Sequence, residues 1–448
     1  MFHFETNGAL AAQRFLPFKR SATFVRCARM LGWQPTPRCT APILARPVGL
    51  VPERKPLQMR ALRRDIAAQP CAGTLRVEFQ RDLAQLAPLA DRWEALNLCR
   101  TDHDAPFFQS FAWNYHVAHV RLSGSPSHFR PMVATIWRDA ELIGVWPLSL
   151  QRSTGVWIAR SLDDPFGQFA GVAFRDAADI TPGVAATIAA LREEADGLQI
   201  EAVVAGSRLH AALLQQKATA IATQDVVVVD MRPFSSFDEF TKTVGSETRK
   251  TMRKRRSRLE RAHKVEHVVA AGAESFAALL SETFDARVEW LRQNGRTSPA
   301  FRTLEFRAIV DGLPHAAGIE LLGTSLKTER GRIANDWGFV YEGAYYDYMS
   351  SMDSDYSEFS PGKLNVGLFL EVCFRRDLKV VEFLAPALDY KLEWTDRIKK
   401  IETMSLPFSV RGRLSADAAG WVMPRVRRLS RMLPESLRRS LVHRLNRK

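Results

Sequence analysis

Apolar and polar residues alternate along many short segments of the chain, and between them apolar residues recur every three or four positions. The first pattern is typical of strands and the second of helices. In the first half, alternation predicts strands at 74–79, 131–137, 142–150, 155–161, 168–174, 199–204 and 225–230. Helical spacing predicts helices at 83–96, 109–119, 182–194 and 209–216. This order predicts an α/β or α+β unit with helices on the faces of its sheet.

The second half repeats this order of elements. Helical spacing predicts helices at 274–294, 301–313 and 361–375. Alternation predicts strands at 318–322, 332–341, 345–351, 379–384 and 402–410. Because the halves match in element order more than in residues, the sequence predicts two tandem domains, each a mixed sheet flanked by helices.

A segment without proline or glycine, from Glu247 to His263, lies between the halves. We predict that Ser246 caps the start of a long helix there. Met252 and Leu259 lie seven positions apart and so share one face of that helix. The predicted parts of the chain are a basic, proline-rich extension at 1–72, a first domain at 73–233, a basic linker helix at 234–266, a second domain at 267–410 and a basic amphipathic tail at 411–448.

The 448-residue chain has a formal net charge of +14, and three segments carry it. Residues 1–60, 249–264 and 421–448 each have a formal charge of +8, so the remaining residues together are net negative. An acidic body with three basic segments lacks the general basic field of a nucleic-acid-binding protein. We therefore expect nucleic acid not to be a partner. The 46% of hydrophobic residues also excludes a disordered chain.

The cysteines and the apolar runs indicate a cytoplasmic protein. The five cysteines are widely spaced, form no CxxC pair and predict a reducing compartment without a metal site. No apolar run approaches the roughly 18 to 20 residues that span a bilayer. Residues 1–58 lack the apolar core of a secretory signal and are interpreted as a flexible extension. A transit peptide, or a translation start at Met59, are the alternatives.

A strand, a polar loop and a helix start between Tyr345 and Asn365 form the most informative segment. The strand YYDYMSS at 345–351 leads through the loop to SPGKLN at 360–365. A helix N-terminus presents unpaired N–H groups and a partial positive charge. Pro361 with Gly362 beside it lets a ligand approach the backbone, and Lys363 adds a cation. These features suit a phosphate or pyrophosphate, and the alternative is an ordinary helix start.

With the segments around it, this motif resembles the GNAT acyltransferases of the CelD type. SPGKLN resembles the family's cofactor-binding helix start, and VEFL at 381–384 with Tyr390 and Lys391 resembles its strand and loop, DFL…YK..W. The segment PFFQSFAW at 106–113 resembles the family's FQ..AW, and the basic helix resembles its Arg-rich linker. Two residues or turns depart from the family pattern: Glu382 stands where Asp is usual, and Ala385-Pro386-Ala387 replaces a Gly-containing turn.

The CelD-type family is associated with cellulose and exopolysaccharide biosynthesis, and its fold is related to the tandem-domain Fem transferases. The resemblance implies acyl transfer from a coenzyme A thioester, with acetyl-CoA as co-substrate, to an amine or hydroxyl of a sugar or polysaccharide precursor. It implies that coenzyme A is held by Ser360, Pro361, Gly362, Lys363, Leu364 and Asn365. The thioester carbonyl would be polarised by the backbone around Met349, Ser350 and Ser351, where that strand parts from its neighbour.

Acyl transfer also needs a proton acceptor and a proton donor. Tyr390 is the predicted donor to the leaving thiolate, and core packing against Trp394 is the alternative for it. The candidate bases are Asp336, Asp347 and Glu382, each of which is alternatively an ion-paired strand residue. Contacts with the acceptor are predicted for Trp290, Trp337, Tyr346 and Lys391. Two other functions stay open: a Fem-like aminoacyl-tRNA-dependent transferase, and a non-catalytic scaffold in a polysaccharide assembly complex.

Two of the basic segments have more than one interpretation. The linker helix has three interpretations: a solvated helix lying along an acidic body, a contact for an anionic substrate or polysaccharide, or a contact for RNA. In the tail, apolar residues from Trp421 to Leu445 recur at helical spacing among Lys and Arg. A basic amphipathic helix of this kind suits the surface of an anionic membrane at its inner face, and docking on the protein is the alternative.

Overall fold

The computed structural model describes residues 74–99, 101–102, 106–124, 127–153, 155–296, 298 and 300–417, and these belong to one compact unit. The strands of the first half are β1 (Leu75–Gln80), β2 (Phe129–Pro131), β3 (Val133–Arg138), β4 (Glu141–Trp146), β5 (Leu148–Ser153), β6 (Val156–Ser161), β7 (Ala173–Phe174), β8 (Gly197–Val204) and β9 (Thr219–Asp230). Its helices are α2 (Leu83–Leu86), α3 (Ala90–Asn97), α4 (Phe111–Gly124), α5 (Ile180–Leu191) and α6 (Arg208–Gln215), with short 3-10 turns η2 (Ala87–Leu89), η3 (Phe107–Gln109) and η4 (Ala177–Asp179).

Two helices follow, α7 (Phe237–Thr243) and the basic helix α8 (Ser246–Ala262). The strands of the second half are β10 (Glu266–Val269), β11 (Glu320–Thr328), β12 (Gly331–Tyr341), β13 (Ala344–Met352), β14 (Val380–Glu382) and β15 (Ile398–Pro407). Its helices are α9 (Gly272–Gln293), α10 (Leu304–Gly312), α11 (Pro361–Arg375), α12 (Asp389–Leu392) and α13 (Val410–Asp417), with η5 (Ala300–Arg302), η6 (Leu313–His315) and η7 (Ser354–Phe359).

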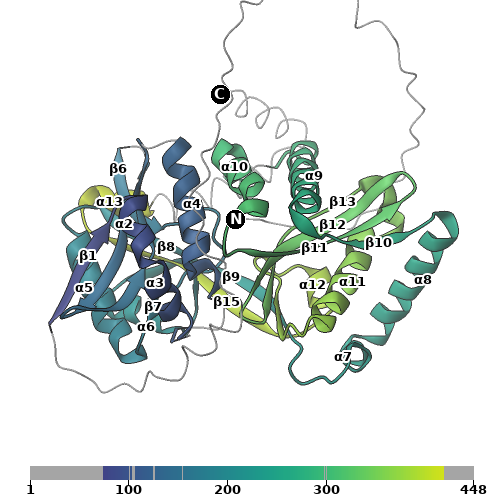
Figure 1. Ribbon diagram of the computed structural model, residues 1–448, viewed down its shortest axis with the longest axis horizontal. Helices are drawn as coiled ribbons and strands as arrows, with labels where there is room; N and C mark the ends of the chain where they lie inside the picture. The colour runs from purple at the N-terminus through teal and green to yellow at the C-terminus, as the bar shows by residue number, and fades with distance from the viewer. Residues whose placement is uncertain are drawn as a thin grey trace, which may run out of the picture. The chain divides into compact units, whose positions relative to one another are not determined.

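One sheet of eleven strands passes through both halves (Figure 1). Its order is β10-β11-β12-β13-β14-β9-β15-β8-β6-β5-β2, and a second sheet has the order β1-β3-β4-β7. The long strand β9 pairs with β14 at one end and with β15 along most of its length. The last strand of the chain's second half, β15, therefore lies between two strands of the first half.

The same strand–helix–strand unit occurs once in each half. In the first half β6 and β8 pair in parallel with α5 between them in the chain. In the second half β13 and β14 pair in parallel with α11 between them. The predicted α/β class, with mixed sheets flanked by helices, is thus confirmed. The boundaries proposed between the domains stay predictions, because the large sheet is continuous across them.

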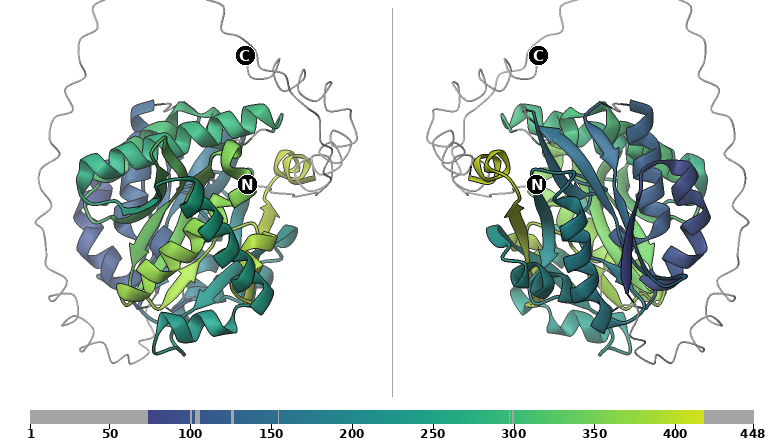
Figure 2. Two further views of the ribbon diagram at one scale, coloured as in Figure 1. Left: turned by 90° about the vertical axis from the view of Figure 1, so that its right-hand side faces the viewer. Right: turned by 90° about the vertical axis from the view of Figure 1, so that its left-hand side faces the viewer.

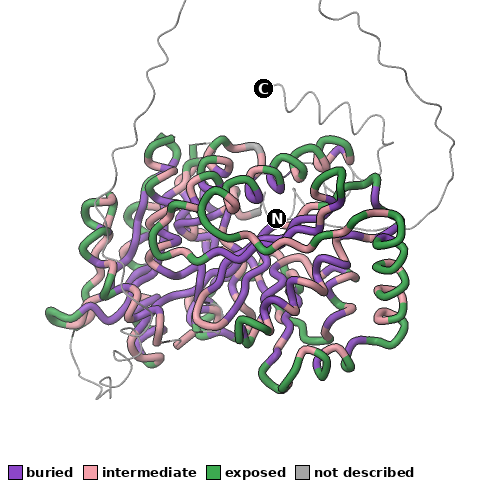
Figure 3. The backbone as a smooth tube through the Cα atoms, turned by 45° about the vertical axis from the view of Figure 1, so that its right-hand side comes forward, coloured by how far each residue is buried: buried purple, intermediate pink, exposed green. Residues whose placement is uncertain are grey.

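Helices cover both faces of the second half's strands (Figure 1). On one face, α9 and α10 pack in an apolar cluster with Phe339 and Tyr346, and on the other α11 packs in a cluster with Tyr345. The left view of Figure 2 shows α8 running along the side that carries α11. Figure 3 shows strands that are mostly buried and an α8 that is mostly exposed, except at Leu259.

The halves also share an aromatic core. The ring of Phe107, which lies in η3, stacks on Phe339 of β12 with centroids 4.2 Å apart. The ring of Phe166, which follows β6, stacks on Phe306 of α10 at 5.1 Å. These rings are buried from water, and burying apolar area is the main favourable term in folding. The two halves therefore share one apolar core and pack directly against each other.

Several sequence predictions differ from the structure. Of the strand predicted at 168–174, Ala173–Phe174 forms β7 and Ala170 makes one parallel bridge with Val203 of β8, while Phe166, just before it, stacks on Phe306 of the second half. Gly245 is the N-cap of α8, and no side-chain cap hydrogen bond is made there. Strand β10 and helix α7 were not predicted, because the charge density of 249–264 dominates the pattern around them.

Two of the predicted segments fall largely outside the described residues. The basic extension at 1–72 lies outside them entirely, and of the amphipathic tail at 411–448 only residues up to 417 are described, as part of α13. In the part of the chain that the structure describes, no helix combines the length and the apolar character needed to cross a membrane.

Gly338 of β12 generates a prediction about stability. A Cβ at Gly338 would lie 1.8 Å from the carbonyl oxygen of Tyr346, which is backbone and has no room to move. We expect Gly338→Ala to lower the free energy of unfolding by at least about 2 kcal/mol through overpacking. In the control Gly124→Ala the new Cβ would meet Glu305 only at 3.6 Å, so a change of less than about 0.5 kcal/mol is expected. Urea denaturation measures both, and equal stabilities would contradict the prediction.

Candidate functional site

Strands β13 and β14 are paired over only three residues and then part. The parallel ladder ends at Tyr346 opposite Glu382. On its other edge β13 continues along β12, where the register shifts: Gly338 pairs with Asp347 and Trp337 with Met349. The shift leaves Tyr348 as an extra residue, which is a β-bulge. The bulge changes the direction of the β13 side chains at the point where β14 separates from β13.

A pocket lies where the two strands part. It is lined by Gln168 of the first half, Arg287 of α9, Asp347, Tyr348, Met349 and Ser350 of β13, Phe383, Leu384, Ala385 and Pro386 after β14, and Tyr390 and Lys391 of α12. Five of the residues selected from the sequence are therefore together here: Asp347, Met349, Ser350, Tyr390 and Lys391.

Lys391 holds the wall of the pocket that follows β14. Its buried ammonium donates hydrogen bonds to the carbonyl oxygens of Phe383 at 2.7 Å, Leu384 at 3.2 Å and Pro386 at 3.2 Å. Leu384 has a φ of 55°, in the left-handed region that is costly for a residue with a Cβ. The three bonds therefore fix a loop whose backbone is strained.

Asp347 is buried and shares its surroundings with Lys391. Burial raises the pKa of the Asp347 carboxyl to about 7, although the Lys391 ammonium opposes this rise. The pKa of Lys391 is lowered to about 8, chiefly by burial. Asp336 on β12 has a pKa well above its ordinary value because of burial and the nearby Asp347 carboxylate. Near neutral pH, Asp347 is thus poised between its acid and base forms.

Tyr390 lies at the same pocket and keeps its proton at neutral pH. Burial and the carboxylates of Asp347 and Asp336 raise the pKa of its phenol, although Arg287 and a hydrogen bond with Ser350 oppose the rise. Arg287 itself has a pKa lowered to about 10, mainly by burial. The pocket therefore combines a carboxyl that titrates near neutrality with a phenol that remains a donor.

The start of α11 lies next to the end of β13. A Cβ at Gly362 would lie 3.5 Å from the sulfur of Met352, the last residue of β13. Ser360 has a left-handed backbone with φ 49°, and its side chain makes no cap hydrogen bond. Pro361 begins the helix, and the first-turn residue Leu364 packs its side chain in a cluster with Leu259 of α8. Lys363 forms an ion pair with Glu393, so its charge is shared with a carboxylate.

Four other residues selected from the sequence are buried away from the pocket. Trp337 and Tyr346 are fully buried in the aromatic core, so a substrate outside the protein does not reach their side chains. Asn365 is fully buried and donates to the Asp336 carboxylate and to the hydroxyl of Thr324. Glu382 is fully buried and ion-paired with Lys399 of β15. The helical and strand positions were predicted correctly, but these side chains face packed interiors.

Trp290 and Ser351 lie near the pocket without lining it. Trp290 is half-buried on α9, with the guanidinium groups of Arg287 and Arg296 each 5.2 Å from its ring. Ser351 continues β13 beyond the pocket and pairs with Asn335.

Two lining residues were missed by the sequence analysis. Arg287 lies three positions before Trp290 on the predicted helix 274–294, so helical spacing alone would have found it. No sequence signal points to Gln168, which reaches the pocket from the first half.

One protein family matches part of the chain, within the second half and the basic helix before it. Residues 246–392 match the family described as acetyltransferase (GNAT) domain. The match begins at the first residue of α8, so the basic helix lies inside the matched segment, and it ends at the last residue of α12. The matched segment supplies every residue that lines the pocket except Gln168, and the CelD-type assignment stays a prediction. No curated protein is significantly similar to the chain.

Solved structures resemble the chain only distantly. FemX has 11% identity over 70% of this chain and 95% of its own, with a TM-score of 0.49. A protein of unknown function from Bacteroides thetaiotaomicron has 11% identity over 74% of this chain and 100% of its own, with a TM-score of 0.46. A tandem GNAT protein from the clavulanic acid biosynthesis pathway has 13% identity over 75% of this chain and 99% of its own, with a TM-score of 0.41.

The bonds of Lys391 lead to a prediction. We expect Lys391→Met to lower the free energy of unfolding by about 3 kcal/mol, because buried carbonyl groups lose their donor. The control Lys379→Met removes an ammonium whose only ion pair in the described residues is with the exposed Asp377, and should change stability by less than about 0.5 kcal/mol. Thermal and urea unfolding test this, and an equally small effect at both positions would refute the structural role of Lys391.

Proposed function

We propose that the protein transfers an acyl group, with acetyl as the first candidate, from a coenzyme A thioester to an amine or hydroxyl of a sugar or polysaccharide precursor. The observation that carries the proposal is the pairing of Asp347 and Tyr390 in one pocket at the parting of β13 and β14. The family match over 246–392 supports the acyltransferase class. The sugar acceptor is supported only by the resemblance of the sequence motifs to the CelD type.

Asp347 is the proposed general base. A base works best when its pKa is near the working pH, and the pKa of Asp347 is about 7. It lines the pocket, whereas Asp336 lies behind it under Asn365 and Glu382 is ion-paired with Lys399. Of the three carboxylates selected from the sequence, Asp347 is therefore the one that can reach a nucleophile.

Tyr390 is the proposed general acid. Its raised pKa keeps the phenol protonated, so it can return a proton to a leaving thiolate. Because the Asp347 and Asp336 carboxylates contribute to the raised pKa, the base and acid assignments depend on one another. Tyr390 packs against the apolar cluster that contains Trp394, and it also lines the pocket. The packing predicted as an alternative is therefore compatible with the proposed role as an acid.

The residues around the parting strands fit an acyl-CoA. Beyond Tyr346, β13 no longer pairs with β14. The backbone N–H groups on that edge of β13 can therefore donate hydrogen bonds to a thioester carbonyl. The start of α11 adjoins the end of β13 through Gly362 and Met352 and would hold the pyrophosphate. When bound, acyl-CoA supplies the activated acyl group; this chain orients it, shields it and moves the protons.

The proposed base can be tested by activity and by pH. Release of free thiol from acetyl-CoA is followed with D-glucosamine as the acceptor. We expect Asp347→Asn to reduce kcat by about 10²- to 10⁴-fold, the usual contribution of a general base. In the wild type, kcat/KM should rise as pH increases through the Asp347 pKa near 7, because only the ionised carboxylate accepts a proton.

In the same assay Asp377→Asn serves as the control for Asp347→Asn. It removes a carboxylate that is exposed on the surface and should leave kcat unchanged. An Asp347→Asn variant that retains full activity and the same pH profile would exclude Asp347 as the base.

Acyl-CoA binding at the start of α11 has a separate test. We expect Gly362→Asp to weaken acetyl-CoA binding in a calorimetric titration by at least about tenfold, because a carboxylate beside the pyrophosphate repels it. The same carboxylate is favourable at a helix N-terminus, so the fold should be preserved. The neutral control Gly362→Ala places its Cβ at an ordinary contact distance from Met352 and should bind within about threefold of the wild type. Unchanged binding by Gly362→Asp would show that the pyrophosphate lies elsewhere.

A further inference from the structure

Gln168 is a buried polar residue that faces the candidate pocket from the first half. Its exposed fraction is 8%, and it lines the pocket with Arg287 and Tyr390. In the described part of the chain, backbone carbonyls on both sides of Gln168 accept hydrogen bonds, but the Gln168 carboxamide makes none. Its amide atoms are not among the fully buried, unpartnered atoms of the described residues, so the polar end of the side chain is open to the pocket.

The segment that carries Gln168 is held on both sides of it. The amide of Gln109 donates to the carbonyl oxygen of Phe169 at 2.8 Å. The hydroxyl of Tyr348, the bulge residue of β13, donates to the carbonyl oxygen of Phe166 at 2.8 Å. The ring of Phe166 also stacks on Phe306 of α10. The position of Gln168 is therefore fixed by the backbone next to it and by the second half of the protein.

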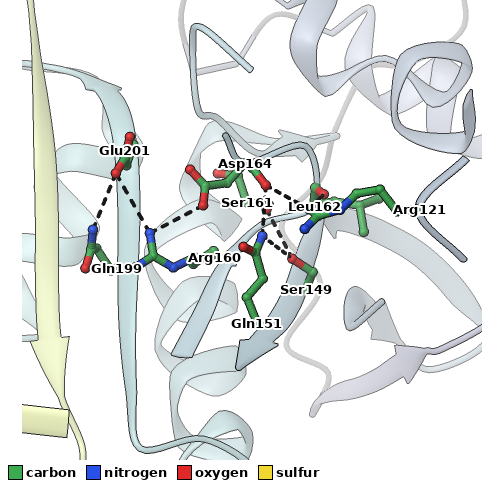
Figure 4. Close-up of polar contacts among 9 residues, drawn as sticks. All are labelled: Arg121, Ser149, Gln151, Arg160, Ser161, Leu162, Asp164, Gln199 and Glu201. Carbon is green, nitrogen blue, oxygen red and sulfur yellow. Dashed lines mark hydrogen bonds and ion pairs between the residues drawn. The ribbon is translucent and has the colours of Figure 1, made fainter. Parts of the chain in front are cut away.

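A polar network anchors the beginning of the same segment (Figure 4). The carbonyl oxygen of Asp164 accepts from the guanidinium of Arg121 at 2.7 Å and from the amide of Gln151 at 2.9 Å. Its carboxylate pairs with Arg160 at 3.3 Å, and Arg160 in turn donates to Gln199 of β8. The carboxamides of Gln151 and Gln199 are hydrogen-bonded within the first half, in contrast to that of Gln168, and Arg121 also pairs with Glu305 of α10 at 3.6 Å.

The side of the pocket that Gln168 occupies indicates its ligand. The proposed acyl-CoA contacts come from the β13 edge and the start of α11, on the sheet face where α11 packs. Gln168 comes from a segment that packs with α9 and α10 on the opposite face. The acceptor must be held within reach of the thioester carbonyl on a side that the proposed acyl-CoA contacts leave open, and Gln168 lies on such a side.

We propose that Gln168 is a specificity-determining residue that hydrogen-bonds a hydroxyl group of the sugar acceptor, so that the acceptor site is completed only by the first half. A carboxamide both donates and accepts, which matches a hydroxyl group. This inference rests on the proposed function, because it assigns the acceptor side of that same pocket. It gives the first half, which lies outside the matched segment 246–392, a direct part in substrate recognition.

The test compares Gln168→Leu with Gln199→Leu. Both remove a buried glutamine amide, with exposed fractions of 8% and 9%, but Gln199 bonds within the network of Figure 4 and does not line the pocket. With acetyl-CoA and D-glucosamine as substrates, we expect Gln168→Leu to raise the KM for D-glucosamine about tenfold, the effect of one lost hydrogen bond. Its kcat and its dissociation constant for acetyl-CoA should stay within about twofold of the wild type.

A calorimetric titration of D-glucosamine into the enzyme saturated with coenzyme A provides a readout that does not need turnover. Weaker binding by Gln168→Leu, with Gln199→Leu like the wild type, supports the inference even if no acetyl transfer occurs, in which case the proposed function alone fails. An equal loss of acetyl-CoA affinity in Gln168→Leu overturns the inference, because the residue then contacts the thioester. Equal binding of D-glucosamine by all three proteins, or by none, overturns it as well.

Discussion

Aromatic packing between the two halves is the interaction on which the rest of the structure depends. Phe107 stacks on Phe339 and Phe166 stacks on Phe306, so rings from the first half complete the core beneath β12, β13 and α10. Close-packed interiors have discrete arrangements rather than a continuous range. This packing holds the segment after β6 in one position against the bulge of β13. Residues that are far apart in the chain therefore line the same pocket.

The chemistry proposed for the pocket depends on a few groups that share one poorly solvated space. Burial raises the pKa of Asp347, and the Lys391 ammonium limits that rise. Lys391 also binds three carbonyl oxygens of the strained turn at Leu384. One side chain thus fixes both the shape of the wall and the acidity of the proposed base, which couples stability to function at this position.

The order of elements was predictable because each strand and helix has its own periodicity, and the pocket residues on β13 and α12 were predictable because they lie in contiguous motifs. The failures have physical causes. Trp337 and Tyr346 were expected at a substrate, but both faces of their strands are covered by helices, so alternation does not separate an exposed face from a buried one. Glu382 is neutralised by Lys399 of β15, and Gln168 arrives from the other half. Neither long-range contact leaves a trace in local sequence.

The position of β15 has a consequence for how the protein folds while it is being synthesised on the ribosome. In the described ladders β8 and β9 each pair with β15, so the first half's own strands are bridged by residues 398–407. Domains usually fold in the order of their synthesis. Here the edges of β8 and β9 remain open until nearly the whole second half has been translated, and open edges invite pairing with other chains. The nascent first half therefore carries two unpaired strand edges until residues 398–407 have been synthesised.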